Sequence, residues 1–329
     1  MMNQKGDTSA NQTKSKLGES QNSYGGILQP QGFPPLPADW ESEWETLASS
    51  DGALQLFGVL HHKKNWKTPK VLVVLHGLGE HGGRYLHLPH YLQNEVDAIY
   101  CLDHRGHGRS EGLRGHVEDF DLYSDDAALV ISRLDEMLKK RFGHSEIHLL
   151  GHSMGGLIGL RTCLKHSTLP LLSATISAPL LGIRMKVPPV KKALSGFLAK
   201  TWGSLQLTST LDPSHLSHDS EVGQAYMKDR LVHLKVTPKF FVSLESAMAD
   251  TLKRDSGFHF PMLLIVPMQD KIVDSDVALE FFRNLKHREK VLKTFADSFH
   301  EPLNEVNKEE IIGEIGKWIH AHPFVQKAV

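Results

Sequence analysis

The sequence predicts an α/β fold in which helices cover both faces of a mostly parallel central sheet. Short apolar runs typical of strands alternate with helical patterns over most of the chain. These strands are apolar throughout rather than alternately apolar and polar, which indicates that both faces of the sheet are buried. The chain has 329 residues, of which 40% are hydrophobic, so it is long enough to form a large core.

The first predicted element is an antiparallel hairpin. Residues 40–47 and 53–60 are strand-like, and the Asp-Gly pair between them favours a tight turn. The β-α units follow in order. Their strands are expected at 71–75, 98–102, 147–150, 174–178, 262–266 and 291–295, and their helices at 85–93, 122–138, 154–164, 275–285 and 306–319.

Two parts of the chain lie outside this alternation. Residues 1–31 are polar, and we expect them to form a disordered tail. Residues 180–257 contain prolines and helical stretches without a clean β-α unit, which indicates a mainly helical insertion placed as a cap over the carboxyl ends of the strands. The core would then comprise residues 32–179 and 258–329.

Composition excludes several classes of partner. The 37 basic and 38 acidic residues nearly cancel, so no global field favours nucleic acid or another polyanion. Cys101 and Cys163 fall in apolar segments and are expected to be buried thiols rather than a disulfide. The sequence shows neither a signal peptide nor a membrane span, so we expect a cytoplasmic protein that at most contacts membranes peripherally. The oligomeric state is left open.

One segment places a serine at a strand-to-helix turn. Residues 151–156 read Gly-His-Ser-Met-Gly-Gly, directly after the apolar run 147–150 and before a helical pattern. Such glycines allow a turn sharp enough to raise the oxygen of Ser153 into a site, where a neighbouring base can activate it. A similar pattern at 108–112 contains Ser110, but polar residues precede it and no apolar helix follows. We therefore predict Ser153 as the nucleophile.

An acid for this serine should follow it in the chain and stand just after a strand, since ligands bind outside the carboxyl ends of strands in such sheets. Asp270 meets both conditions because it comes shortly after the run 262–266. Asp274 and Asp276 remain alternatives, although both lie where the next helix starts.

The base is expected among the histidines that follow the acid. Of the 21 histidines, His287, His300, His320 and His322 lie beyond Asp270. Only His300 stands in a loop between a predicted strand and the final helix. His300 would take the proton of Ser153, and Asp270 would hold its imidazole in the required tautomer.

Two backbone N–H groups are expected to stabilise the negative oxygen that develops during such a reaction. One belongs to Met154, and the other to Leu78 in the loop at 76–85, which reads His-Gly-Leu-Gly-Glu-His-Gly-Gly-Arg-Tyr. No Lys-Ser or Lys-Thr pair follows these glycines, so they do not match a phosphate-binding loop. The histidine-rich stretch at 103–110 lacks the further ligands of a metal site, and we expect neither a metal nor a cofactor.

With these residues in place, the chain resembles the monoacylglycerol lipase and lysophospholipase branch of the α/β-hydrolases from about Trp40 to its end. The likeness rests on residues 76–85, on Asp-His-Arg-Gly-His-Gly-Arg-Ser-Glu-Gly at 103–112, on residues 151–156 and on His-Glu-Pro-Leu-Asn-Glu at 300–305. It implies the α/β-hydrolase fold and hydrolysis of esters of single-chain lipids, most directly of monoacylglycerol to glycerol and fatty acid. In this resemblance Ser153, Asp270 and His300 match the triad, and Leu78 and Met154 the oxyanion hole.

The resemblance also implies that the head group of a small lipid ester is contacted by Glu80, Arg84, His152 and Tyr226. The chain has Arg230 where the family usually has proline, and Pro267 where it usually has glycine, so the head-group preference stays open. The alternatives are a lysophospholipase, a general carboxylesterase, a peptidase and a hydrolase-like ligand-binding protein.

The predicted cap contains an amphipathic helix. Apolar residues recur there at intervals of three and four, at Val190, Ala193, Leu194, Phe197, Leu198, Trp202 and Leu205. This stripe could pack against the core, line an acyl tunnel or touch a lipid surface.

Overall fold

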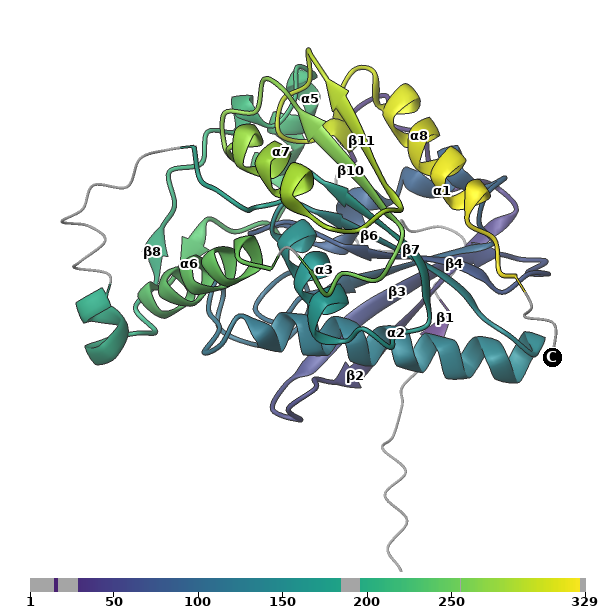
Figure 1. The fold of residues 1–329 in the computed structure, drawn as a ribbon, viewed down its shortest axis with the longest axis horizontal. Helices are drawn as coiled ribbons and strands as arrows, with labels where there is room; N and C mark the ends of the chain where they lie inside the picture. Colours follow the sequence, from purple (N-terminus) through teal and green to yellow (C-terminus); the bar gives the residue numbers. More distant parts are fainter. Residues whose placement is uncertain (1–14, 17–28, 185–195, 255, 326–329) are drawn as a thin grey trace, which may run out of the picture.

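The computed structural model describes residues 15–16, 29–184, 196–254 and 256–325. Its main strands are β1 (Ser15–Lys16), β2 (Trp40–Ala48), β3 (Gln55–Lys63), β4 (Lys70–Leu75), β5 (Ala98–Asp103), β6 (Glu146–His152), β7 (Leu171–Ser177), β10 (Met262–Pro267) and β11 (Lys290–Phe295). Within the described residues they form one nine-stranded sheet in the order β1-β2-β3-β5-β4-β6-β7-β10-β11 (Figure 1).

The sheet is antiparallel at its amino-terminal edge and parallel elsewhere. β2 pairs antiparallel with β3, and β3 pairs antiparallel with β5, whereas all pairs from β5 to β11 are parallel. The predicted hairpin and mostly parallel sheet are therefore confirmed. β1 is an addition, since Ser15 lies opposite Trp44 within the stretch expected to be disordered, while residues 1–14 and 17–28 of that stretch lie outside the described residues.

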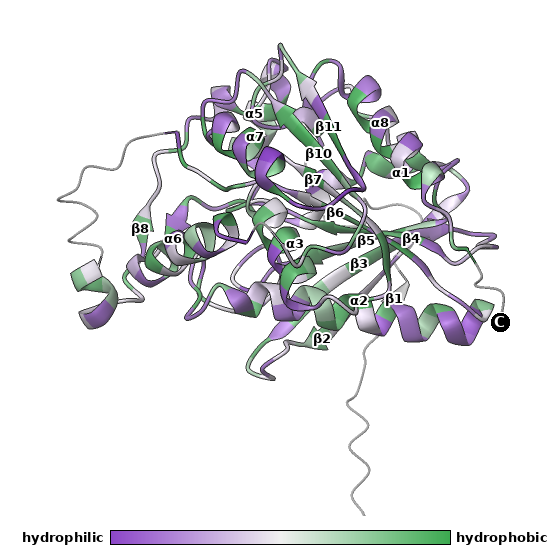
Figure 2. Ribbon diagram, viewed as in Figure 1, coloured by the Kyte–Doolittle hydropathy of each residue, from purple (hydrophilic) through white to green (hydrophobic). Residues whose placement is uncertain are grey.

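Helices cover both faces of the sheet, as the continuous apolar strands predicted. The alternate residues Leu72 and Val74 of β4 join the cluster formed with α1 (Leu88–Leu92) and α8 (Lys308–Ala321). Val73, between them, joins the cluster on the other face, with α2 (Asp121–Phe142), α3 (Met154–Lys165) and α7 (Ser275–Asn284). Figure 2 shows the central strands in hydrophobic colours and the helices in mixed colours.

The helix expected at 85–93 begins later than predicted. The chain instead forms a short 3-10 turn, η1 (Gly82–Tyr85), and α1 begins only at Leu88. Pro89 explains this start, because a proline lacks an N–H and is tolerated in a helix only within the first turn. The last helix likewise begins later than expected, after the 3-10 turn η3 (Pro302–Asn304).

The segment between β7 and β10 holds a helical piece at 196–201, β8 (Leu207–Thr208), η2 (Pro213–His215), α5 (Ser220–Lys228), β9 (Lys235–Val236) and α6 (Pro238–Leu252). It is attached to loops at the carboxyl ends of the strands. His233 N–H donates to the carbonyl of Gly79 (2.8 Å), and Thr237 N–H donates to that of Gly115 (3.0 Å). α6 and β8 lie on the left in Figure 1. A cap role for residues 180–257 stays a prediction.

Candidate active site

Ser153 lies on a tight turn between β6 and α3, with φ 54° and ψ −116°, a left-handed conformation rare for a residue with a side chain. The positions two residues before and two residues after Ser153 must be glycines. A Cβ on Gly155 would lie 2.0 Å from the carbonyl oxygen of Leu75, and a Cβ on Gly151 would lie 2.3 Å from that of Gly155. The backbone N–H of Ser153 donates to the backbone carbonyl of Ser177 (2.9 Å), and the carbonyl of Ser153 accepts from the N–H of Leu180 (3.0 Å), so these hydrogen bonds hold the strained turn.

The structure brings Ser153, His300 and Asp270 together from three loops. Ser153 Oγ lies 2.9 Å from His300 Nε2, and His300 Nδ1 lies 2.7 Å from Asp270 Oδ2. The three residues are 7%, 5% and 1% exposed. Asp270 follows β10, His300 follows β11, and Ser153 follows β6, so all stand at the carboxyl ends of parallel strands.

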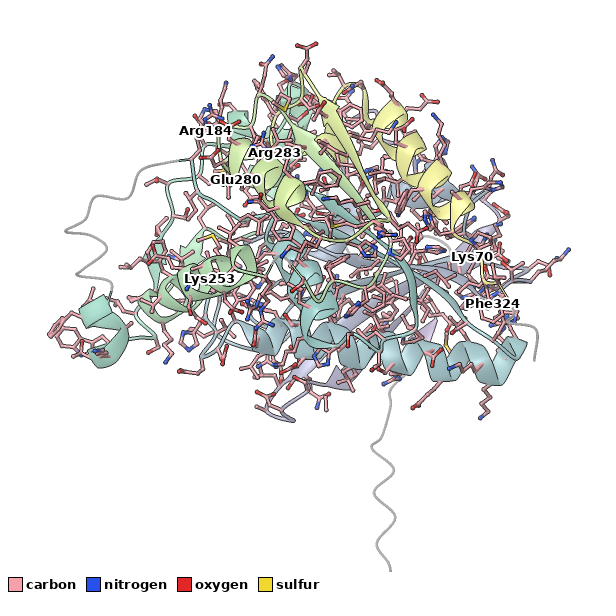
Figure 3. All side chains as sticks on the ribbon, in the orientation of Figure 1. Lys70, Arg184, Lys253, Glu280, Arg283 and Phe324 are labelled. Atoms are coloured by element: carbon pink, nitrogen blue, oxygen red, sulfur yellow. The ribbon has the colours of Figure 1, made fainter. Side chains whose placement is uncertain are left out.

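The Asp270 carboxylate is fixed on both of its oxygens. Oδ1 accepts hydrogen bonds from the backbone N–H groups of Ile272 (2.7 Å) and Val273 (3.0 Å), which leaves Oδ2 facing His300. Arg184 donates to the carbonyl of Asp270 (3.1 Å). In Figure 3 Arg184 lies well apart from Lys70, which marks the amino end of β4.

Charge and burial act in opposite directions on these groups. Burial alone would lower the pKa of His300, but the hydrogen-bonded Asp270 carboxylate raises that pKa above its ordinary value. Burial alone would raise the pKa of Asp270, but His300 and the two backbone donors lower it. The ionised Asp270 carboxylate therefore stabilises the imidazolium that His300 becomes when it accepts a proton. His152, whose ring lies 5.1 Å from that of His300, has a pKa lowered to about 4 by burial.

The loop that carries Leu78 lies against Ser153. A Cβ on Gly77 would be 3.4 Å from the Cβ of Ser153, and Gly79 has a positive φ of 77° where a Cβ would meet the carbonyl of His233 at 2.3 Å. Met154 is the first residue of α3, so its N–H lies among those that a helix leaves without an internal partner. This geometry suits an oxyanion hole at Leu78 and Met154, whose role stays a prediction.

A buried charged cluster adjoins the same loop. Arg84 donates through Nη1 to Glu80 Oε2, and through Nη1 and Nη2 to both oxygens of Glu301 (2.7 and 2.8 Å). Glu80 Oε1 also accepts from the hydroxyl of Tyr85 (2.8 Å). The ring of Tyr226 lies under the Arg84 guanidinium, 4.9 Å from its carbon. Glu80, Arg84 and Tyr226 thus come together as expected, but Arg84 is bound to internal carboxylates.

Glu301 was missed by the sequence analysis. It directly follows His300 in the chain, and its partner Arg84 lies 217 residues away. The sequence does show a charged residue directly after the predicted base. Because that stretch packs against the core, a charge there must be paired with an opposite charge, and this could have pointed to Glu301.

The two departures from the family pattern lie at element ends. Arg230 is exposed in the turn after α5. Pro267 ends β10, and its carbonyl accepts from Ser275 Oγ (2.6 Å). In the part of the chain that the structure describes, neither residue forms a hydrogen bond with the side chains of Ser153, His300 or Asp270.

The rejected candidates have structural roles. Ser110 accepts from the N–H of Phe57 (2.8 Å) and donates to the carbonyl of Asp103. Asp274 caps α7 by accepting from the N–H of Asp276 (3.1 Å). In the histidine-rich loop Arg105 binds Asp126. Over the described ranges, no three or more His, Cys, Asp or Glu side chains are grouped so as to hold a metal ion.

Part of the apolar stripe in the 180–257 segment faces solvent. Phe197, Trp202 and Leu205 are 60%, 65% and 46% exposed, so packing against the core is wrong for this half of the stripe. Val190, Ala193 and Leu194 lie outside the described residues. In the part of the chain that the structure describes, no helix combines the length and apolar character needed to span a bilayer. Cys101 and Cys163 are buried free thiols, as expected.

Comparisons with known proteins agree with this geometry. The model of the family Hydrolase_4, described as serine aminopeptidase, S33, matches residues 67–307. Monoglyceride lipase of Mus musculus is 31% identical over 264 residues, which cover 77% of this chain and 84% of that protein. The crystal structure of Paleococcus ferrophilus monoacylglycerol lipase has a TM-score of 0.70 and 30% identity, and covers 82% of this chain and 99% of that one.

An uncharacterized abhydrolase domain-containing protein of Dictyostelium discoideum is 30% identical over 265 residues. The match covers 78% of this chain but only 27% of that protein, so the chain spans about a quarter of its length. The chain therefore belongs to the Hydrolase_4 family of α/β-hydrolases, it is similar to the monoglyceride lipases, and it is an enzyme that hydrolyses esters.

Proposed function

We propose that the protein hydrolyses esters of single-chain lipids, and foremost monoacylglycerols, through an acyl-enzyme on Ser153. The observation that carries this proposal is the buried hydrogen-bonded chain from Ser153 through His300 to Asp270. The substrate class is supported by similarity to proteins named monoglyceride lipase and monoacylglycerol lipase.

In the first half of the reaction, the ester carbonyl carbon is attacked by Ser153 Oγ, and the Oγ proton passes to His300 Nε2. The carbonyl oxygen becomes negative and receives hydrogen bonds from the N–H groups of Leu78 and Met154. The tetrahedral intermediate then collapses. The bond to the leaving oxygen breaks, and His300 returns its proton to that oxygen, so that glycerol leaves and the acyl group stays on Ser153.

In the second half, water repeats these steps. His300 takes a proton from the water, whose oxygen attacks the acyl carbon, and the fatty acid leaves as Ser153 regains its proton. Asp270 stays ionised throughout and stabilises the imidazolium at each step. The lowered pKa of Asp270 and the raised pKa of His300 both suit this division of roles.

The test combines labelling with a substrate panel. A fluorophosphonate probe should label the wild-type protein and Ser110→Ala but not Ser153→Ala, because only Ser153 has a neighbouring base. Hydrolysis is then measured on monoacylglycerols, lysophospholipids, p-nitrophenyl esters of rising chain length and a peptide substrate.

A preference for long-chain monoacylglycerols supports the proposal. Strict preference for acetate esters or for peptides would instead favour a general carboxylesterase or a peptidase. An unlabelled wild-type protein that still binds lipid would identify a hydrolase-like binding protein.

Residues 180–257 are proposed to form a cap that meets lipid surfaces. The support is that four large apolar side chains within this short stretch are exposed, namely Phe197, Trp202, Leu205 and Leu207. Single exposed apolar residues are common on protein surfaces, whereas several together mark a site of interaction. Wild-type protein should float with phosphatidylcholine vesicles, and a Phe197→Ser/Trp202→Ser double variant should float less. Equal flotation of both proteins would contradict a contact through these side chains.

A further inference from the structure

The charged cluster of Glu80, Arg84 and Glu301 lies beside the nucleophile. We infer that Glu301 determines head-group selectivity by occupying the Arg84 guanidinium, so that the site accepts uncharged leaving groups such as glycerol and rejects leaving groups that carry a phosphate. This inference rests on the proposed function and specifies the substrate class for the same site.

The first step is the position of the cluster. A Cβ on Gly77 would lie 2.9 Å from Glu80 Oε1 and 3.4 Å from the Cβ of Ser153, so the carboxylate and the nucleophile flank the same backbone atom. Glu301 directly follows His300. A phosphate on the third glycerol carbon is only a few bonds from the ester oxygen, so it would approach this cluster during hydrolysis.

The second step is the use of the guanidinium. Arginine has five N–H donors in a planar fork, which makes it the residue best suited to bind phosphate. In this structure three of its hydrogen bonds go to carboxylates, two of them to Glu301 in the bidentate geometry that a phosphate would otherwise use. The ring of Tyr226 covers one face. Three of the five donors, including the pair that would form a bidentate contact with a phosphate, are therefore already bound to carboxylates.

The third step is the charge balance. Burial alone would raise the pKa of Glu301 and of Glu80, but Arg84 keeps both pKa values below their usual range. Two ionised carboxylates thus surround one guanidinium, and all three groups are at least nine-tenths buried. The cluster is negative in a region of low dielectric, where a second anion is repelled more strongly than in water.

The test compares kcat/KM for 1-acylglycerol and for the lysophosphatidate with the same acyl chain. Wild-type enzyme should prefer the uncharged substrate by about tenfold or more. Glu301→Gln removes one negative charge with little change of shape, and should shift the ratio toward the lysophosphatidate by about tenfold, equivalent to about 1.4 kcal/mol. In an Arg84→Gln background the shift should disappear.

Glu305→Gln is the matched control. Glu305 is a buried carboxylate on the same loop, but it binds the N–H of Phe299 and not Arg84. Its substitution should leave the substrate ratio unchanged, even if the activity on both substrates falls. Should Glu301→Gln fold poorly, Glu80→Gln removes the other charge on Arg84 and should shift the ratio in the same direction.

The outcomes separate this inference from the proposed function. Hydrolysis of monoacylglycerol with a wild-type ratio in Glu301→Gln would overturn the inference alone, as would a wild-type preference for lysophosphatidate. If Ser153→Ala and wild type were equally inactive on every ester, the proposed function would fail first.

Discussion

Replacing Asp270 by asparagine should abolish most of the activity while leaving the site assembled. The two backbone N–H groups of Ile272 and Val273 point at Oδ1, so the amide oxygen of Asn should take that position. The amide nitrogen would then face His300 Nδ1, where the carboxylate oxygen lies 2.7 Å away in the native protein. A donor in this place forces Nδ1 to accept a hydrogen bond and puts the imidazole proton on Nε2.

The magnitude follows from that change of tautomer. A protonated Nε2 cannot take the proton of Ser153 at its 2.9 Å separation, and the imidazolium loses its counter-charge. An equivalent tautomer error in a serine protease triad lowers kcat about 10⁴-fold, and at about 1.4 kcal/mol per tenfold this corresponds to 5 to 6 kcal/mol. We expect a loss of about 10³- to 10⁴-fold in kcat for Asp270→Asn.

The assay is single-turnover and steady-state hydrolysis of a monoacylglycerol, with thermal unfolding as a check on folding. Asp274→Asn is the control, because Asp274 caps α7 and asparagine is an equally good cap. It should keep kcat and Tm. Retention of more than a tenth of kcat by Asp270→Asn, or an equal loss in Asp274→Asn, would refute the reasoning.

Four further predictions concern backbone space and pH. Gly155→Ala should destabilise the protein by about 1 to 3 kcal/mol and lower kcat about 100-fold, because its Cβ would lie 2.0 Å from the carbonyl of Leu75 and displace Ser153. Gly313→Ala should raise stability by about 0.5 to 1 kcal/mol, because Gly313 lies within α8 and no atom lies within 4 Å of the added Cβ. Urea titrations measure both variants, and a Gly155→Ala protein more stable than Gly313→Ala would contradict both glycine predictions. The kcat/KM should fall as pH decreases through the pKa of His300, above 6.5, and a profile flat down to pH 6 would contradict the raised value. The free energy of unfolding should fall as pH decreases from 6.5, because each buried histidine stays neutral in the folded protein but takes up a proton in the unfolded chain. The fall should be about 1.4 kcal/mol per pH unit for each such histidine. Equal free energies of unfolding at pH 7.5 and pH 5 would contradict this prediction. Those histidines include His61, His104 and His148, with pKa values of about 3, and His87, His152 and His233, with pKa values of about 4.

The parallel core could be predicted because its strands are recognisable one at a time. A run such as 71–75 is buried on both faces and is therefore apolar at every position, which local sequence displays directly. Once the strand ends were placed, the rule that ligands bind beyond the carboxyl ends selected Asp270 and His300 from many candidates. The apolar strand before Ser153 and the helix after it are visible in the local sequence in the same way, and Ser110 lacks both, so Ser153 could be selected.

What the sequence could not supply depends on contacts between distant segments. The pairing of Glu301 with Arg84 joins loops 217 residues apart, and nothing in either loop specifies the other. The three- and four-residue spacing around Trp202 predicts a helix face but not what covers it, and in the structure this residue is 65% exposed. β1 uses backbone hydrogen bonds along a sheet edge, which nearly any residue can make, so its two residues carry no pattern.

The central claim is that Ser153 carries the acyl group during turnover. Rapid acid quenching of the enzyme with a p-nitrophenyl or monoacylglycerol ester, followed by peptide mass spectrometry, measures this directly. We predict one acyl adduct on the peptide that contains Ser153, and its absence in Ser153→Ala together with the loss of hydrolysis. An adduct on another residue such as Ser110, or continued hydrolysis by Ser153→Ala, would contradict the claim.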